Sequence, residues 1–169
     1  MRTSFLLIAG LLLATGLAPT ANAAGDWGLG FLSSEIPVGV FFKANDRTTI
    51  HGAIDFAKYD VPSGSSATET EVAVAAAVVW DFWTASSWGF GIAPGVSYRN
   101  FSPQTGDSHS ETRIPIQLAG HWNPTDMFSL WFSHGVVVAI DSPAQGDSQT
   151  DFYTNGNNVT DFGFTVWAP

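Results

Sequence analysis

The sequence predicts an all-β protein, an eight-stranded antiparallel up-and-down transmembrane β-barrel. Apolar and polar residues alternate with a period of two over eight runs, which is typical of β-strands. Tryptophan gathers at the short connections between these runs, whereas the other connections are long and acidic. The face opposite the apolar one consists of glycine and alanine with a few charges, which suits the narrow interior of a small barrel.

The N-terminal segment has the composition of a secretory signal peptide, which we predict to span residues 1–23. Arg2 supplies the positive charge, Phe5 to Leu17 form the apolar core, and Ala21-Asn22-Ala23 has the small residues of a cleavage site. Residues 24–169 are then expected to form one barrel domain. No stretch within them reaches the roughly 18 consecutive apolar residues of a spanning helix, so strands are expected to cross the membrane.

The composition narrows the classes of function. The formal net charge of −9 argues against a nucleic-acid partner. The chain has no cysteine, so its stability cannot come from disulfides. The 4 histidines show no zinc-binding spacing, and we expect neither a metal site nor a cofactor.

The eight strands are predicted near residues 26–34, 36–44, 47–58, 70–82, 88–100, 111–122, 127–140 and 158–167. Short turns are expected at 45–46, 84–87 and 123–126, and long acidic loops at 60–69, 102–111 and 141–158. An even number of strands puts both ends of the barrel on the same, periplasmic side. Pro94 and Pro115 fall inside strands, where each removes a ladder hydrogen bond, so both predict β-bulges.

The two faces of the strands favour a membrane barrel over a soluble sheet. Ile54, Val74, Ile92 and Ile116 belong to the apolar face and are expected to point outward. A soluble sheet would fill its other face with lysine, glutamate and threonine. A soluble exported β-barrel that binds an apolar ligand inside is the alternative to this interpretation.

The tryptophans predict the orientation of the barrel in a bilayer, because aromatic residues gather at membrane interfaces. We expect one belt around the periplasmic end, whereas the alternation turns Trp131 into the lumen. The predicted belt consists of Trp27, Trp80, Trp83, Trp88, Trp122 and Trp167.

Polar residues on the inward face predict a cluster inside the lumen. Such a cluster either forms a path for protons or ligands, or consists of paired groups that close the lumen. The small bore of an eight-stranded barrel favours the closed form. The predicted cluster consists of Lys43, His51, Asp55, Glu71, Asp81, Arg99, Arg113, Gln117, His121 and Asp161.

Several short segments resemble the small outer-membrane barrels of diderm bacteria, the opacity-type and OmpA-type proteins. They are the glycine-rich run 27–31, the segments 36–40 and 93–98, and the final run 162–167. The resemblance implies an outer-membrane location, contact with outer-membrane lipid including lipopolysaccharide, and insertion by the barrel-assembly machinery. The family usually ends on an aromatic residue, whereas Ala168 and Pro169 follow Trp167 here.

His134 stands out, because alternation points it at lipid from the middle of a strand. One interpretation is a β-bulge at Ser133-His134-Gly135 that returns the imidazole to the lumen. The other is a catalytic base, since the segment weakly resembles the lipid A 3-O-deacylases, whose motif is His-x-Ser-Asn. In that motif Val136 stands where the serine nucleophile belongs, and a base without a nucleophile forms no acyl-enzyme.

The favoured function is therefore that of a non-enzymatic outer-membrane barrel with a plugged lumen and a structural or surface-interaction role through its acidic outer loops. These loops could also bind cations, although no spacing of carboxylates matches a calcium loop. The alternative enzymatic hypothesis is a deacylase-like hydrolase that uses His134 on the same fold.

Overall fold

The computed structural model describes residues 26–33, 36, 38–60, 68–103, 107–154 and 159–168. The predicted signal peptide lies outside these residues. Within them, no helix is long and apolar enough to span a bilayer. The strands are β1 (Trp27–Leu32), β2 (Val38–Asn45), β3 (Thr48–Asp60), β4 (Thr68–Ala85), β5 (Trp88–Pro103), β6 (His109–Thr125), β7 (Phe128–Ser142), β8 (Gln149–Tyr153) and β9 (Thr160–Trp167).

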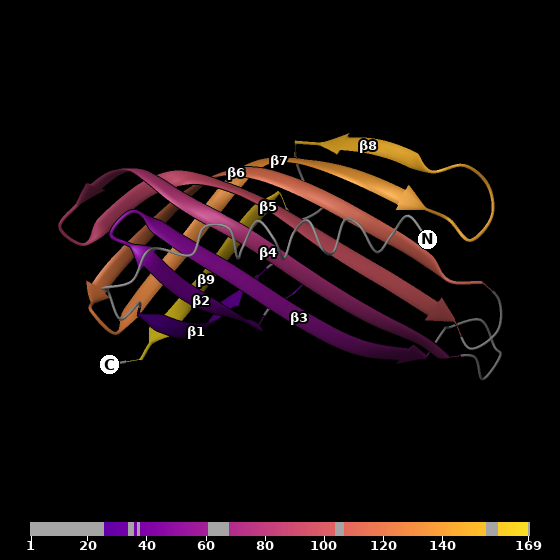
Figure 1. Ribbon diagram of the computed structural model, residues 1–169, viewed down its shortest axis with the longest axis horizontal. Helices are drawn as coiled ribbons and strands as arrows, with labels where there is room; N and C mark the ends of the chain where they lie inside the picture. The colour runs from indigo at the N-terminus through magenta and orange to yellow at the C-terminus, as the bar shows by residue number, and fades with distance from the viewer. Residues whose placement is uncertain are drawn as a thin grey trace.

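The strands form a closed antiparallel barrel with eight positions around its circumference (Figure 1). Neighbours in sequence pair from β1 to β7, and β9 closes the ring between β1 and β7. β8 and β9 share one edge of β7: β8 pairs with Val137–Asp141, and β9 pairs with Phe128–His134. The predicted fold class is confirmed, although the loop predicted at 141–158 contains the additional strand β8.

One rim of the barrel carries the short turns. Two-residue links join β2 to β3, β4 to β5 and β6 to β7, and Trp27 and Trp167 lie at the same rim, where the Ala168 amide donates to the Trp27 carbonyl at 2.8 Å. We call this end the turn rim and the opposite end the loop rim. The described strand pairings shift register near the turn rim, between Lys43 and Asn45, between Asp81 and Trp83, and between Trp122 and Thr125.

The prolines do not form bulges, contrary to the prediction. Pro115 continues the β6–β7 register between Ile114 and Ile116 without a shift. Around Pro94 the register against β4 and β6 is the same on both sides of the proline. Each proline lacks the N–H that would donate a ladder hydrogen bond, but the register of the strands is unchanged.

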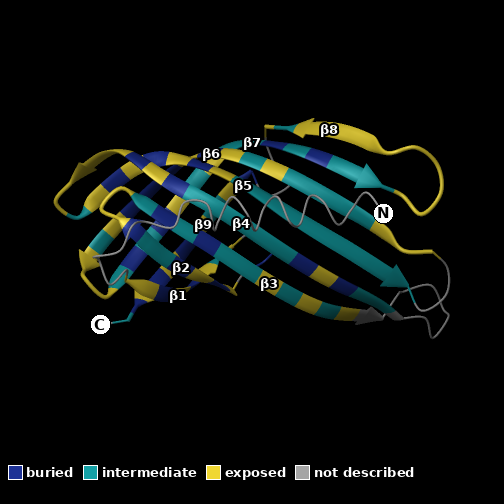
Figure 2. Ribbon diagram, viewed as in Figure 1, coloured by how far each residue is buried: buried dark blue, intermediate teal, exposed yellow. Residues whose placement is uncertain are grey.

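Exposed and buried residues alternate along much of the barrel strands (Figure 2). The exposed positions carry large apolar side chains, and many of the buried ones carry small residues. Ile54 is 71% exposed and Leu118 66% exposed, while Ile92 and Ile116 are exposed as well. Ala73, Ala93, Ala119 and Ala139 are buried on the inner face. The isoleucines thus point outward, as predicted.

The barrel wall is shorter on one side. β2 pairs with β3 only as far as Ala53, whereas the pairing of β3 with β4 continues to Asp60. Beyond this level, the described strands β3 to β8 form an open sheet with edges at β3 and β8. Figure 1 shows these strands projecting past β1, β2 and β9 toward the loop rim.

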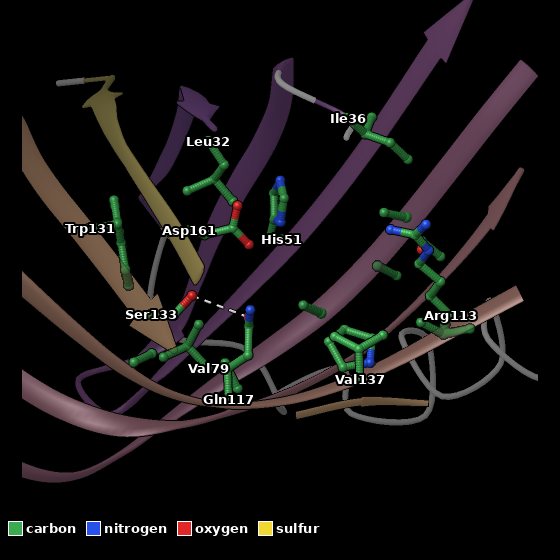
Figure 3. Close-up of a pocket in the computed structure, with 18 of the residues that line it drawn as sticks. Leu32, Ile36, His51, Val79, Arg113, Gln117, Trp131, Ser133, Val137 and Asp161 are labelled. Carbon is green, nitrogen blue, oxygen red and sulfur yellow. Dashed lines mark hydrogen bonds between the residues drawn. The ribbon is translucent and has the colours of Figure 1, made fainter. Parts of the chain in front are cut away.

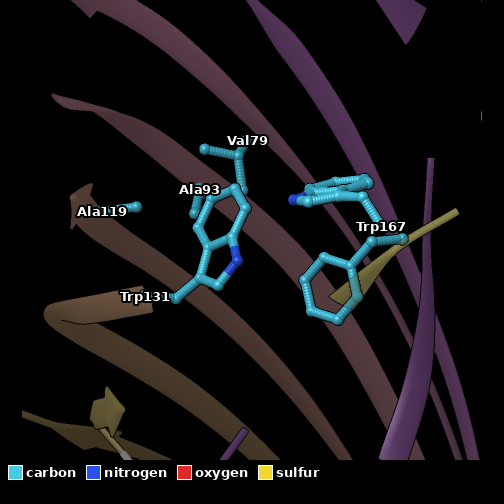
Figure 4. Packing of buried hydrophobic residues seen from close by; sticks show 6 residues of the cluster. Val79, Ala93, Ala119, Trp131 and Trp167 are labelled. Carbon is cyan, nitrogen blue, oxygen red and sulfur yellow. The ribbon is translucent and has the colours of Figure 1, made fainter. Parts of the chain in front are cut away.

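A layer of apolar side chains crosses the barrel interior (Figure 4). The Trp131 ring lies 5.7 Å from the Phe41 ring, and the Trp167 ring lies 6.4 Å from it. Both indoles are satisfied: Trp131 Nε1 donates to Thr165 Oγ1 at 2.9 Å, and Trp167 Nε1 donates to Ser129 Oγ at 2.7 Å. We call this the apolar layer; its members are Phe41, Val79, Ala93, Ala119, Trp131 and Trp167.

Candidate functional site

The barrel interior holds a polar vestibule between the apolar layer and the turn rim. Its volume is about 300 Å³, and Lys43, Asp81 and His121 line it. Lys43 lies 3.6 Å from Asp26 and 4.2 Å from the centre of the Trp167 ring. The vestibule therefore places one ammonium group, three carboxylates and one imidazole beside the rings of Trp131 and Trp167.

A chain of hydrogen bonds runs through the vestibule wall from the apolar layer to Asp81. Trp167 donates to Ser129, and Ser129 Oγ donates to Asn123 Oδ1 at 2.5 Å. Asn123 Nδ2 lies 3.2 Å from His121 Nδ1, and His121 Nε2 lies 2.9 Å from Asp81 Oδ2. Because Asn123 can donate only from its nitrogen, Nδ1 is the acceptor and the Nε2 proton points to the carboxylate.

Two glycines make room for the histidine rings inside the barrel. A Cβ at Gly89 would collide with the ring of His121, and a Cβ at Gly39 would collide with the ring of His51. Gly89 lies directly across the ladder from His121, whereas Gly39 pairs with Ala53, two residues along β3 from His51. The small residues of the inner face therefore determine which positions can hold a large polar side chain.

A second cavity lies on the other side of the apolar layer and has a volume of about 130 Å³. Apolar residues line it together with polar ones, which are His51, Ser97, Arg113, Gln117, Ser133 and Asp161 (Figure 3). The His51 ring stacks on Phe41 with 4.3 Å between the ring centres. We call this space the inner cavity.

Ion pairs occupy the inner face nearer the loop rim. Arg99 Nε lies 2.5 Å from Glu71 Oε1, and Arg113 Nε lies 2.8 Å from Glu111 Oε1. Asp55 accepts a hydrogen bond from the backbone N–H of Phe56 at 2.8 Å. Paired in this way, the charges are stabilised on a face that is partly removed from water.

The predicted lumen residues thus lie on one face but in separate groups. Lys43, Asp81 and His121 belong to the vestibule, and the others lie beyond the apolar layer. Sequence reasoning missed Glu111 and Asp26, each of which pairs with a predicted residue. Glu111 has the same alternation phase as Arg113 and could have been found, whereas Asp26 precedes the first strand.

The tryptophans differ in whether they point outward or into the lumen. Trp27, Trp80, Trp83, Trp88 and Trp122 are exposed on the outer face. Trp167 is only 2% exposed and belongs to the apolar layer, so its assignment to the outward belt was wrong. Phe162, Phe164 and Val166 point outward, and the period of two then turns residue 167 inward. Trp131 is buried, as its alternation phase predicted.

His134 is exposed on the outer wall, so the interpretation that a β-bulge returns it to the lumen is wrong. The β6–β7 register runs without a shift through Ser133, His134 and Gly135. His134 Nδ1 lies 2.7 Å from the hydroxyl oxygen of Thr160, its partner on β9. The sequence motif placed Val136 at the nucleophile position, but the adjacent strand brings a hydroxyl beside the imidazole.

Among the described residues, no group of three or more histidine, cysteine, aspartate or glutamate side chains is arranged to hold a metal ion. The described acidic loop residues include Asp107 and Asp147, both exposed.

Comparisons with known proteins support the architecture. No family model and no curated protein sequence matches the chain. The fold is similar to that of a solved structure, a major outer membrane protein from Thermus thermophilus, with a TM-score of 0.50. The alignment covers 86% of this chain and 100% of the Thermus chain, at 11% sequence identity. At this identity the likeness shows that the two proteins share a barrel fold.

Proposed function

We propose that the chain is a non-enzymatic outer-membrane β-barrel with a closed lumen and a structural or surface-interaction role. The observation that carries this proposal is the outer wall, where large apolar side chains are exposed around the whole barrel. A soluble protein rarely exposes so much contiguous apolar surface, whereas lipid solvates it. These residues include Leu29, Val40, Ile54, Val72, Trp80, Phe90, Ile116, Leu118, Phe132 and Phe164.

The apolar layer supports the closed lumen. Trp131 and Trp167 lie across the bore between the vestibule and the inner cavity, and both are almost fully buried. Each indole N–H is held by a hydroxyl of the wall, which fixes the ring against rotation. Ions would have to displace these rings in order to pass.

The exposed tryptophans of the outer wall also support an orientation of the barrel in the membrane. Exposed tryptophans at the turn rim form the periplasmic belt, and the acidic loops then face the exterior. There they would contact lipopolysaccharide, through bridging cations, or another surface. The signal peptide and the barrel-assembly machinery supply the route to the membrane.

Fractionation of cells that express the full chain tests the compartment. We expect the protein in the outer-membrane fraction, with faster gel mobility before boiling than after, because the folded barrel stays compact in detergent. A soluble periplasmic protein and an inner-membrane protein serve as fractionation controls. Recovery in the soluble fraction without detergent would overturn the assignment and favour the soluble ligand-binding barrel.

The contact between His134 and Thr160 favours a second candidate function, an acyl-ester hydrolase that acts on surrounding lipid. His134 would accept the Thr160 hydroxyl proton while the oxygen attacks an ester carbonyl. The imidazolium would return the proton to the departing alcohol, and water would hydrolyse the acyl-threonine. The 2.7 Å separation is within the range for such a proton transfer.

Mass spectrometry of lipid A tests this candidate in cells carrying the wild-type protein or Thr160→Val. The hydrolase predicts loss of an acyl chain with the wild-type protein and full acylation with Thr160→Val, because valine keeps the shape of threonine without its hydroxyl. Thr150→Val, on exposed β8, is the matched control and should behave like the wild type. Identical lipid A with and without the protein would end the hydrolase hypothesis.

A further inference from the structure

The inner cavity combines an apolar wall with the dimensions of a small ligand. Its volume of about 130 Å³ is close to the roughly 150 Å³ of an engineered protein cavity that binds benzene. Side chains from strands on opposite sides of the barrel converge on it (Figure 3). The apolar part of the wall includes Leu32, Ile36, Phe41, Val79, Trp131 and Val137.

Three of the polar groups, Ser133, Gln117 and Asp161, lie together on one part of this wall, whereas Arg113 lies on another part (Figure 3). Ser133 Oγ donates to Gln117 Oε1 at 3.1 Å, and Gln117 Nε2 donates to the Val159 carbonyl at 3.3 Å. These contacts use Gln117 as both donor and acceptor, so its position is fixed. Figure 3 shows the Asp161 carboxylate projecting into the same space, between Trp131 and His51.

The Asp161 carboxyl group interacts with Gln117, but one of its two oxygens receives no hydrogen bond from the described wall. Its Oδ1 atom is buried and has no hydrogen-bond partner among the described residues. A buried polar atom without a partner costs about 1–3 kcal/mol, and more when the group is charged. A ligand that donates a hydrogen bond to this oxygen would recover that cost.

We propose that the inner cavity binds a compact apolar molecule, about the size of one aromatic ring, that carries a single hydroxyl or amino donor directed at Asp161. The apolar wall accommodates the ring, and the carboxylate selects the donor. The volume excludes larger molecules such as whole phospholipids. The apolar layer separates this site from the vestibule, and Trp131 lines both spaces.

The test uses two probes with the same ring, 4-fluorophenol and 4-fluoroanisole, because only the phenol has a donor. Fluorine NMR would follow each probe with the protein folded in lipid vesicles, and protein-free vesicles would give the partitioning background. We expect saturable binding of 4-fluorophenol, at least about tenfold tighter than 4-fluoroanisole, as a hydrogen bond to a charged acceptor provides. Absence of saturable binding, or equal affinity for the two probes, would overturn the proposal.

Two variants assign the binding to this site. Asp161→Leu keeps a similar shape but removes the acceptor, so the preference for the phenol should disappear. Ala75→Leu fills the cavity, and binding of both probes should be lost, while Ala85→Leu, exposed at a turn, should leave it intact. Should Ala75→Leu fail to fold, Ala77→Leu fills the same wall. Binding that survives filling in a folded variant would contradict the proposal.

Discussion

Leu118→Arg is expected to destabilise the barrel in a bilayer by about 2–4 kcal/mol, because a cation near the middle of a lipid-facing strand loses its hydration. Leu118 is 66% exposed on the outer face and lies near the middle of β6. Denaturant titration of the protein in phosphatidylcholine vesicles, followed by tryptophan fluorescence, measures the change in the free energy of unfolding.

Ala85→Arg is the matched control, because Ala85 is exposed at the turn rim. There the penalty for a cation falls to about 0–1 kcal/mol. Equal and small effects of the two substitutions would mean that Leu118 faces water and that the outer wall does not contact lipid.

Trp131→Ala is expected to cost about 3–5 kcal/mol, the usual range when a buried aromatic side chain is removed from a core. The indole lies between the Phe41 ring at 5.7 Å and the His121 ring at 4.8 Å. The substitution also removes the indole N–H that donates a hydrogen bond to the Thr165 hydroxyl. The same vesicle titration measures the loss.

The replacement should also open the lumen, since Trp131 contributes to both the vestibule and the inner cavity. Planar-bilayer recordings should show no ion conductance for the wild type and an increased conductance for the double variant Trp131→Ala and Trp167→Ala. Trp122→Ala, on the outer face, controls for loss of a tryptophan. A loss of stability in Trp131→Ala no greater than in Trp122→Ala would contradict the role assigned to the apolar layer.

The fold class could be predicted because each strand presents one face to the outside and one to a narrow bore. The period of two then gives direction to most side chains, including Ile54, Ile116 and Trp131. The same alternation would have placed Trp167 in the lumen, but the prediction used its position at the end of a strand instead. The position of a residue along the barrel axis does not determine whether its side chain points inward or outward.

Other features depend on pairing between strands, which a single strand does not encode. Thr160 reaches His134 only through the register of β9 against β7. The strand β8 forms because its edge pairs with β7, and its composition resembles that of a polar loop. Likewise, the paired residues on both sides of Pro94 and Pro115 keep the strands in register at these prolines.

The unequal heights of the barrel wall give its two ends different resistance to local opening. Near the turn rim, each strand is held by ladders on both sides, so releasing one strand breaks two sets of hydrogen bonds. Beyond Ala53, β3 is held only by β4 among the described strands, and β8 only by β7. Partial unfolding would therefore begin at these two edges and stop where β1, β2 and β9 complete the ring, so the apolar layer would stay packed while the loop rim opens and closes.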